Sequence, residues 1–237
     1  MIDVVTLKAA NGKRWANARM TRDFSAAAKR LVAAKTRYQA VEARTGVPWA
    51  IIAVIHERES SQNWSRSLAQ GDPWDRVSIH VPAGRGPFES WEDAAIDALV
   101  NCAPHAARNK DWSIAAALTK LEEYNGLGYA ARGKPSPYVW AGTNQYQSGK
   151  YVRDGVYDPN AVDRQPGCAG LLTAMMRLDP SIQFGAGVAP GASASKATSA
   201  PKSLGKPSST SPSVRNPSSG SIGALIKSLL GAIVGGK

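Results

Sequence analysis

The chain has 237 residues, 43% of them hydrophobic, and a formal net charge of +11. That apolar content is enough to bury a core, which excludes a wholly disordered chain. No run of residues approaches the roughly 18 apolar positions that a membrane-spanning helix needs, and two cysteines are too few for a disulfide scaffold.

The charge is unevenly distributed along the chain. All 18 acidic residues precede Gly185, whereas residues 185–237 contain six basic residues. Residues 1–184 therefore carry 23 basic and 18 acidic side chains, a net charge of +5, and the remaining residues carry +6. The first ten residues lack the basic start and apolar block of a secretory signal, so we expect synthesis in the cytoplasm and reduced thiols at Cys102 and Cys168.

The sequence predicts that residues 1–184 form a mainly helical domain. A first helix is expected over residues 23–44, with Asp23 as its cap and Gly46 at its end. A second helix is expected to begin at Pro48, a residue favoured at the first helical position, and to end near Ser60.

Three more helices and a short strand follow. Ser90 is expected to open a third helix, Asp111 a fourth that ends at Gly126, and the last helix spans Cys168–Leu178. Residues 77–81 alternate between apolar and polar side chains and lie between turn sequences, which predicts a strand of a small β-hairpin.

The C-terminal part differs in composition. Residues 185–220 consist mostly of Gly, Ala, Ser, Pro, Thr and Lys and are predicted to be a disordered linker. Residues 221–237 are predicted to form a cationic amphipathic helix. This helix either lies on a membrane surface or serves as an oligomerisation or docking segment. Its apolar positions follow helical spacing: Ile222, Leu225, Ile226, Leu229, Leu230 and Ile233.

One carboxylate in the second helix is placed where the core should be. With 100° per residue, Glu59 falls inside the apolar stripe that Ile51 and Ile55 define, whereas Glu57 falls on the opposite face. Burial and the negative end of the helix dipole should both raise the pKa of Glu59, as a general acid for glycosidic cleavage requires. Arg58 lies near the same stripe, so a structural ion pair is the competing interpretation.

Three short motifs now occur in order. Arg58-Glu59-Ser60 resembles the Arg-Glu-Ser of goose-type lysozymes and the Glu-Ser of lytic transglycosylases, Gly71-Asp72 resembles the Gly-Asp pair of goose-type enzymes, and Tyr124-Asn125-Gly126 resembles a late Tyr-Asn-Ala-Gly segment. The matches cover roughly residues 47–130. The chain is therefore similar to the lysozyme-like superfamily, as a phage or prophage endolysin or a bacterial relative. The family's Gly-Leu-Met-Gln segment is absent, and VSIHVPAGRGPF stands in its place.

This resemblance implies an α+β lysozyme-like fold and a set of site residues. Glu59 would be the catalytic acid and Tyr124 would line the cleft. The second carboxylate, which activates water, would be Asp72, with Asp75 as the other candidate, unless the sugar's own 6-hydroxyl attacks as in transglycosylases. The expected substrate-binding residues are Ser60, Asp75, His80, Tyr124, Asn125 and Tyr129.

Other residues of this region receive structural interpretations. We expect Glu57 to be solvated or paired with a basic residue, and His56 to pack or to form hydrogen bonds. Six of the seven tyrosines lie in residues 124–157, where they either stack on sugar faces or anchor a long loop. No metal or cofactor is expected.

The function expected from these observations is cleavage of the glycan strands of bacterial peptidoglycan by a monomeric hydrolase. A basic protein is attracted to an anionic cell wall. The alternatives are a lytic transglycosylase, a chitinase or chitosanase, and a structural virion or secretion component without activity. Nucleic acid is not an expected partner, because more than half of the excess positive charge lies in residues 185–237, the tail of the chain. Release by a holin, carriage in a virion or another export route would bring the enzyme to the wall.

Overall fold

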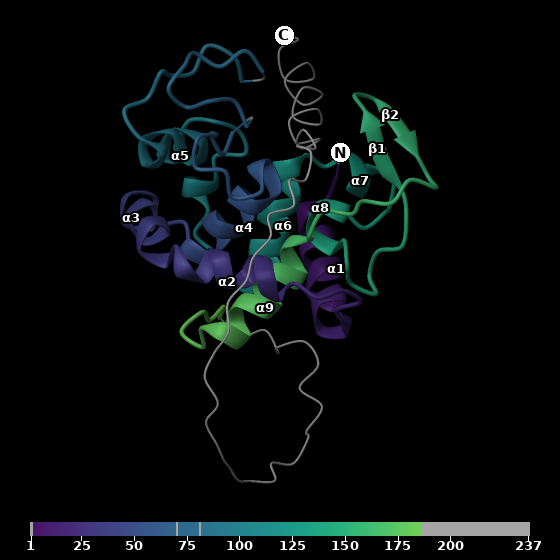
Figure 1. Cartoon of the computed structure of the whole chain (residues 1–237). Helices are drawn as coiled ribbons and strands as arrows, with labels where there is room; N and C mark the ends of the chain where they lie inside the picture. Colours follow the sequence, from purple (N-terminus) through teal and green to yellow (C-terminus); the bar gives the residue numbers. More distant parts are fainter. Residues whose placement is uncertain (1, 70, 81, 186–237) are drawn as a thin grey trace, which may run out of the picture.

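The computed structural model describes residues 2–69, 71–80 and 82–185, and these are mostly helical with one two-stranded antiparallel sheet (Figure 1). The elements in chain order are α1 (Val4–Asn17), α2 (Ser25–Ala33), α3 (Lys35–Thr45), α4 (Trp49–Ser60), α5 (Trp91–Val100), the 3-10 helix η1 (Ala106–Arg108), α6 (Ile114–Asn125), α7 (Gly128–Ala131), α8 (Pro137–Trp140), β1 (Lys150–Arg153), β2 (Val156–Asp158) and α9 (Cys168–Leu178). The predicted helical class with a small hairpin is thereby confirmed at this coarse level.

Helix α4 is the centre of the fold. Every residue from Trp49 to Glu59 is buried, because α2, α3, α6 and α9 pack around it (Figure 1). The sequence predicted one apolar and one solvated face, and this is wrong for α4. Glu57 is buried on the side opposite to Glu59 and pairs with Arg30 of α2 at 3.4 Å. The pairing expected for Glu57 is therefore confirmed, but not its solvation.

Several predicted helix boundaries are confirmed. Helix α4 ends at Ser60, and Ser90 caps α5 by accepting a hydrogen bond from the Asp93 N–H at 3.1 Å. Gly46 ends α3 with φ of 70°, a left-handed conformation that glycine adopts without strain. Helix α9 spans Cys168–Leu178 as predicted.

Other boundaries differ. The helix expected over residues 23–44 is two helices, α2 and α3, which meet at Ala34. Helix α2 packs mainly on α9, whereas α3 packs on α4 and α5. The bend at Ala34 allows the two helices to contact these different neighbours. Pro48 is the N-cap of α4 and not its first helical residue, and α6 begins after Ser113, whose N–H donates to Asp111. The helices α1, η1, α7 and α8 were not predicted.

The predicted strand over residues 77–81 is wrong for residues 77–80, which are irregular. The N–H groups of Ile79 and His80 donate to the Asp72 carboxylate at 2.9 Å each, so they are not available to a strand partner. The hairpin is formed by β1 and β2 instead, with Tyr151 opposite Tyr157. Asp154-Gly155 makes its turn, with φ of 70° at Gly155.

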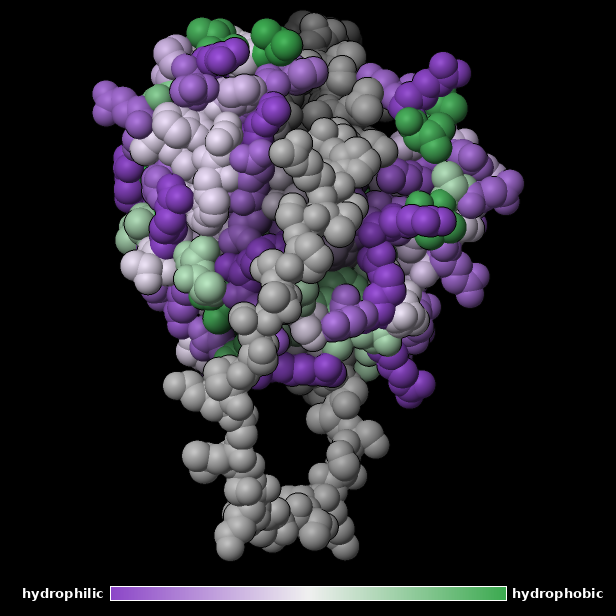
Figure 2. Space-filling model, in the orientation of Figure 1, coloured by the Kyte–Doolittle hydropathy of each residue, from purple (hydrophilic) through white to green (hydrophobic). Residues whose placement is uncertain are grey.

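Side chains of the helices form one main hydrophobic cluster, and a small second cluster lies under the hairpin. The largest fully buried side chains include Trp15, Trp91 and Trp140. The surface in view is largely hydrophilic, with small apolar spots over the loop before α5 and over the hairpin (Figure 2). These two regions contain the exposed Val77 and Ile79, and Val152 and Val156, respectively.

Both cysteines are buried thiols, as expected. Among the described residues, no helix is long and apolar enough to cross a membrane. The predicted amphipathic helix over residues 221–237, and all of the predicted linker except Gly185, lie outside the residues that the structure describes.

Candidate functional site

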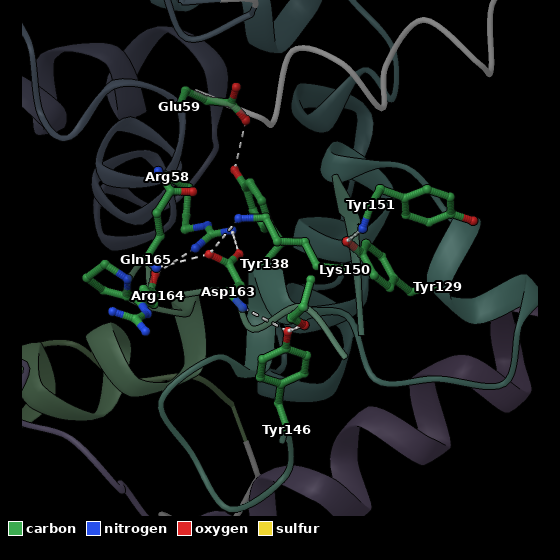
Figure 3. Close-up of polar contacts among 12 residues, drawn as sticks. Arg58, Glu59, Tyr129, Tyr138, Tyr146, Lys150, Tyr151, Asp163, Arg164 and Gln165 are labelled. Atoms are coloured by element: carbon green, nitrogen blue, oxygen red, sulfur yellow. Dashed lines mark hydrogen bonds and ion pairs between the residues drawn. The ribbon is translucent and has the colours of Figure 1, made fainter. Parts of the chain in front are cut away.

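The carboxyl group of Glu59 lies at the C-terminal end of α4 and is 1% exposed. The phenol of Tyr138, from α8, donates a hydrogen bond to Glu59 Oε1 at 3.1 Å (Figure 3). Burial, and after it the charge of Glu59, raises the pKa of Tyr138 well above its ordinary value. Tyr138 therefore stays protonated and holds one oxygen of Glu59 as a neutral donor.

A buried ion pair lies beside Tyr138. Arg58 donates to Asp163 at 2.9 Å, and its guanidinium lies 4.8 Å from the centre of the Tyr138 ring (Figure 3). Burial alone would raise the pKa of Asp163, but the charge of Arg58 and hydrogen bonds hold it below its ordinary value, so Asp163 is ionised. Arg58 therefore forms a structural ion pair with Asp163, a partner that the sequence did not identify, and its guanidinium lies beside the tyrosine that contacts Glu59.

The Gly71-Asp72 turn lies against the same end of α4. A Cβ atom at Gly71 would stand 3.3 Å from the Glu59 carbonyl oxygen, and φ is 68° there, so the close approach suits glycine. Asp72 is 6% exposed. One of its oxygens accepts the N–H groups of Ile79 and His80, and the other lies 2.6 Å from His80 Nδ1.

These hydrogen bonds determine how readily the Asp72 carboxylate can accept a proton. Burial would raise its pKa, but the hydrogen bonds from His80 and Ile79 hold the pKa below its ordinary value. A carboxylate in this state accepts a proton poorly. Asp75, the other candidate base, is exposed three residues further along the same loop. The structure therefore places the backbone of the Gly71-Asp72 turn against the end of α4 that carries Glu59, and the Asp72 carboxylate is in a state that suits an orienting group better than a base.

His80 projects from the Asp72 loop, and its side chain is 59% exposed. His56 differs, because it is fully buried and lies between the Tyr38 hydroxyl at 3.0 Å and the Asn63 carbonyl oxygen at 3.1 Å. Burial lowers the pKa of His56 to about 4. The hydrogen-bonding role expected for His56 is confirmed.

Tyr124 and Asn125 close α6 and are both buried. The Tyr124 hydroxyl donates to the Leu68 carbonyl oxygen at 2.9 Å, which ties the end of α6 to the segment that leads into Gly71. Burial and then the charge of Glu59 raise the pKa of Tyr124, so the two side chains influence one another. Tyr124 thus lies at the end of α6 within electrostatic range of Glu59.

The other two predicted binding residues have local contacts. The Ser60 hydroxyl donates to the His56 carbonyl oxygen and accepts the Asn63 N–H, both at 3.2 Å, so it closes the end of α4. The Tyr129 hydroxyl accepts the Tyr151 N–H at 3.1 Å, and its ring packs edge-on against Tyr151 (Figure 3). The anchoring interpretation therefore holds for Tyr129, which supports the hairpin.

Sequence reasoning missed Tyr138 and Asp163 as parts of the site. Tyr138 was one of several tyrosines with no motif to distinguish it. Asp163 had an indirect signal, because an arginine on the central buried helix requires an acidic partner. Among the described residues, no group of three or more His, Cys, Asp or Glu side chains is arranged to hold a metal ion.

No protein-family model, curated protein or solved structure matches the chain.

Proposed function

We propose that the protein is a glycosidase that cleaves the β-1,4 bonds of bacterial peptidoglycan, with Glu59 as the general acid. The observation that carries this proposal is a single carboxyl group at the end of the central helix, buried and held by a neutral phenol. Burial and the negative end of the helix both favour the protonated form that a general acid needs.

In the proposed reaction Glu59 donates its proton to the glycosidic oxygen as the bond to the anomeric carbon breaks. Tyr138 donates to Oε1 and thereby fixes the orientation of the carboxyl group that gives up the proton. Arg58, which is fixed by Asp163, holds the tyrosine ring in place. The net charge of +11 favours approach to the anionic cell wall and disfavours a cationic polymer such as chitosan.

One observation favours a second candidate, a lytic transglycosylase. The carboxylate of Asp72, the expected base, accepts three hydrogen bonds, and its pKa is lowered. The transglycosylase route needs only the acid, because the 6-hydroxyl of the sugar attacks and leaves an anhydro product. Mass spectrometry of the released fragments distinguishes this product from the reducing end that hydrolysis leaves.

The test compares the wild type with Glu59→Gln on purified peptidoglycan, followed by loss of turbidity. Glu59→Gln should lose activity by about 100-fold or more, the usual contribution of a positioned acid. Glu57→Gln is the matched control, because Glu57 is a buried carboxyl group of the same helix that pairs with Arg30 and has no part in the proposed chemistry. Equal activity of wild type and Glu59→Gln would contradict the proposal.

A further inference from the structure

Apart from Glu59, the structure contains a buried carboxylate, Asp72, that contacts an exposed histidine, His80. Asp72 Oδ1 lies 2.6 Å from His80 Nδ1. An ionised carboxylate can only accept hydrogen bonds, so Nδ1 carries a proton, and the tautomer with this contact is the one whose neutral ring has its lone pair on Nε2. The contact with Asp72 thus leaves Nε2 as the ring nitrogen that can accept a proton from solvent or substrate, on a side chain that is 59% exposed.

The loop that carries His80 is held in place by hydrogen bonds. The Ser78 hydroxyl donates to the Pro82 carbonyl oxygen at 3.0 Å and accepts the Arg85 N–H at 2.9 Å. Arg85 in turn forms a bidentate ion pair with Asp97 of α5. The imidazole is therefore fixed both by Asp72 and through a loop anchored to a helix.

The backbone of the Gly71-Asp72 turn connects His80 to the end of α4. Gly71 packs against the Glu59 carbonyl oxygen, and Asp72 follows Gly71 directly. The Asp72 carbonyl oxygen also accepts the Ser67 N–H at 2.8 Å, which fastens this turn to the segment that leaves α4. His80 is thus attached to the end of α4 that holds Glu59.

From this geometry we infer that His80 is the general base of the proposed glycosidase and that Asp72 is its positioning residue. The inference rests on the proposed function and replaces the direct role of Asp72 as base. Imidazole is the side chain best suited to accept a proton near neutral pH, and a carboxylate on its other nitrogen fixes the tautomer and stabilises the imidazolium that forms.

A water oxygen forms the new bond to the anomeric carbon and gives one proton to His80 Nε2. The bond from the anomeric carbon to the glycosidic oxygen breaks, and the leaving oxygen takes the proton of Glu59. The products are a reducing end and a free hydroxyl, and the enzyme is left with an imidazolium and a carboxylate that exchange the proton through solvent.

The test uses the full chain and His80→Gly, measured on purified peptidoglycan with and without added imidazole. We expect His80→Gly to lose about 100-fold in the release of reducing ends, and imidazole to restore part of it, because the small base enters the space left by the side chain. His105→Gly is the matched control, since His105 contacts the Val100 carbonyl oxygen and has a left-handed φ of 52° that glycine accepts. This control should keep wild-type activity.

A second readout does not depend on activity. Nitrogen NMR of the His80 ring should show the proton on Nδ1 in the wild type, and Asp72→Asn should shift it toward Nε2. An Nε2-protonated ring in the wild type would overturn the inference, and so would a His80→Gly variant that is fully active or insensitive to imidazole.

The outcomes separate this inference from the proposed function. If Glu59→Gln is inactive while His80→Gly is fully active, the glycosidase stands and only the base is wrong. If the wild type releases only anhydro-sugars, the acid stands and water activation by His80 is wrong. If Glu59→Gln is as active as the wild type, the proposed function itself fails.

Discussion

At the scale of single residues, the hydrogen bond from Tyr138 to Glu59 should set the pH range of activity. The Tyr138 phenol donates a hydrogen bond to Glu59 Oε1, and this bond is stronger when the carboxyl group is ionised. It therefore stabilises the ionised form of Glu59. Tyr138→Phe should therefore move the alkaline loss of activity upward by about one pH unit, as expected for a hydrogen bond to a charged group. The measurement is the initial rate on purified peptidoglycan between pH 4 and 9.

Tyr129→Phe is the control for this prediction. It removes an equally buried phenol, but that phenol bonds to the hairpin backbone. Its pH profile should match that of the wild type even if the protein is less stable. A Tyr138→Phe profile that loses height without a shift would mean that the phenol only supports packing.

The position of Glu59 could be predicted from the sequence, but its neighbours could not. Helical spacing alone placed Glu59 among apolar residues, because such spacing relates side chains that are near one another in the sequence of a single helix. Tyr138 and Glu59 are 79 residues apart, and Arg58 and Asp163 are 105 apart. Contacts of this range depend on how whole helices pack, which periodicity does not encode.

At the scale of elements, local signals located several helix ends, but they missed α1 and misplaced the strand. Capping residues and left-handed glycines act within a few residues, so the boundaries at Ser90, Gly46 and Gly126 follow from the sequence. The alternation over residues 77–81 was misleading, because the Asp72 side chain takes the backbone N–H groups that a strand would use. The Asp154-Gly155 turn was the stronger hairpin signal.

Packing between α2 and α9 provides a stability prediction. A Cβ atom at Gly170 of α9 would overlap the ring of Phe24, which precedes α2 and is itself buried. Gly170→Ala should therefore lower the free energy of unfolding by about 1 to 3 kcal/mol, the usual cost of overpacking a core. Urea unfolding, followed by circular dichroism, measures this change.

Gly12→Ala is the matched substitution on α1. Its Cβ atom would stand 3.3 Å from Ala115 Cβ, a tight contact that partly offsets the roughly 1 kcal/mol gained in helix propensity. The free energy of unfolding should change by less than about 1 kcal/mol. If Gly170→Ala were no more harmful than Gly12→Ala, the close approach of Phe24 to α9 would be wrong.

At the scale of the whole molecule, His56 should make folding sensitive to acid. Burial lowers its pKa to about 4, whereas an unfolded histidine titrates near 6.5. The unfolded chain therefore binds the proton first as the pH falls, and the native state loses about 3 kcal/mol between pH 6.5 and 4. Below the folded pKa both states are protonated and the loss stops.

The measurement is the free energy of unfolding at several pH values for wild type and His56→Gln. Burial raises the pKa of Glu57 and of Glu122, and these groups act in the opposite direction in the acid range. They are present in both proteins, so they cancel when the two are compared. The advantage of wild type over variant should shrink by about 3 kcal/mol on acidification, and a constant difference would contradict the assignment.

Charge is the property that extends over the whole chain, and its distribution predicts how the protein reaches its proposed substrate. Residues 186–237 contribute six positive charges and no negative ones, so a chain that ends at Gly185 keeps a net charge of +5. Attraction between a basic protein and an anionic polymer weakens as salt shortens the screening length, to about 10 Å at 0.1 M. The shortened chain should therefore bind purified cell walls less tightly and with a weaker dependence on salt.

A full-length variant decides whether charge is the cause. Replacing the six basic residues with glutamine removes the charge and keeps the apolar positions of residues 221–237: Lys196, Lys202, Lys206, Arg215, Lys227 and Lys237. If this variant and the shortened chain lose equal affinity in sedimentation assays at 50 and 500 mM salt, the tail acts through charge. If only the shortened chain loses affinity, the apolar residues make the contact, and vesicles of anionic lipid should then bind the glutamine variant but not the shortened chain.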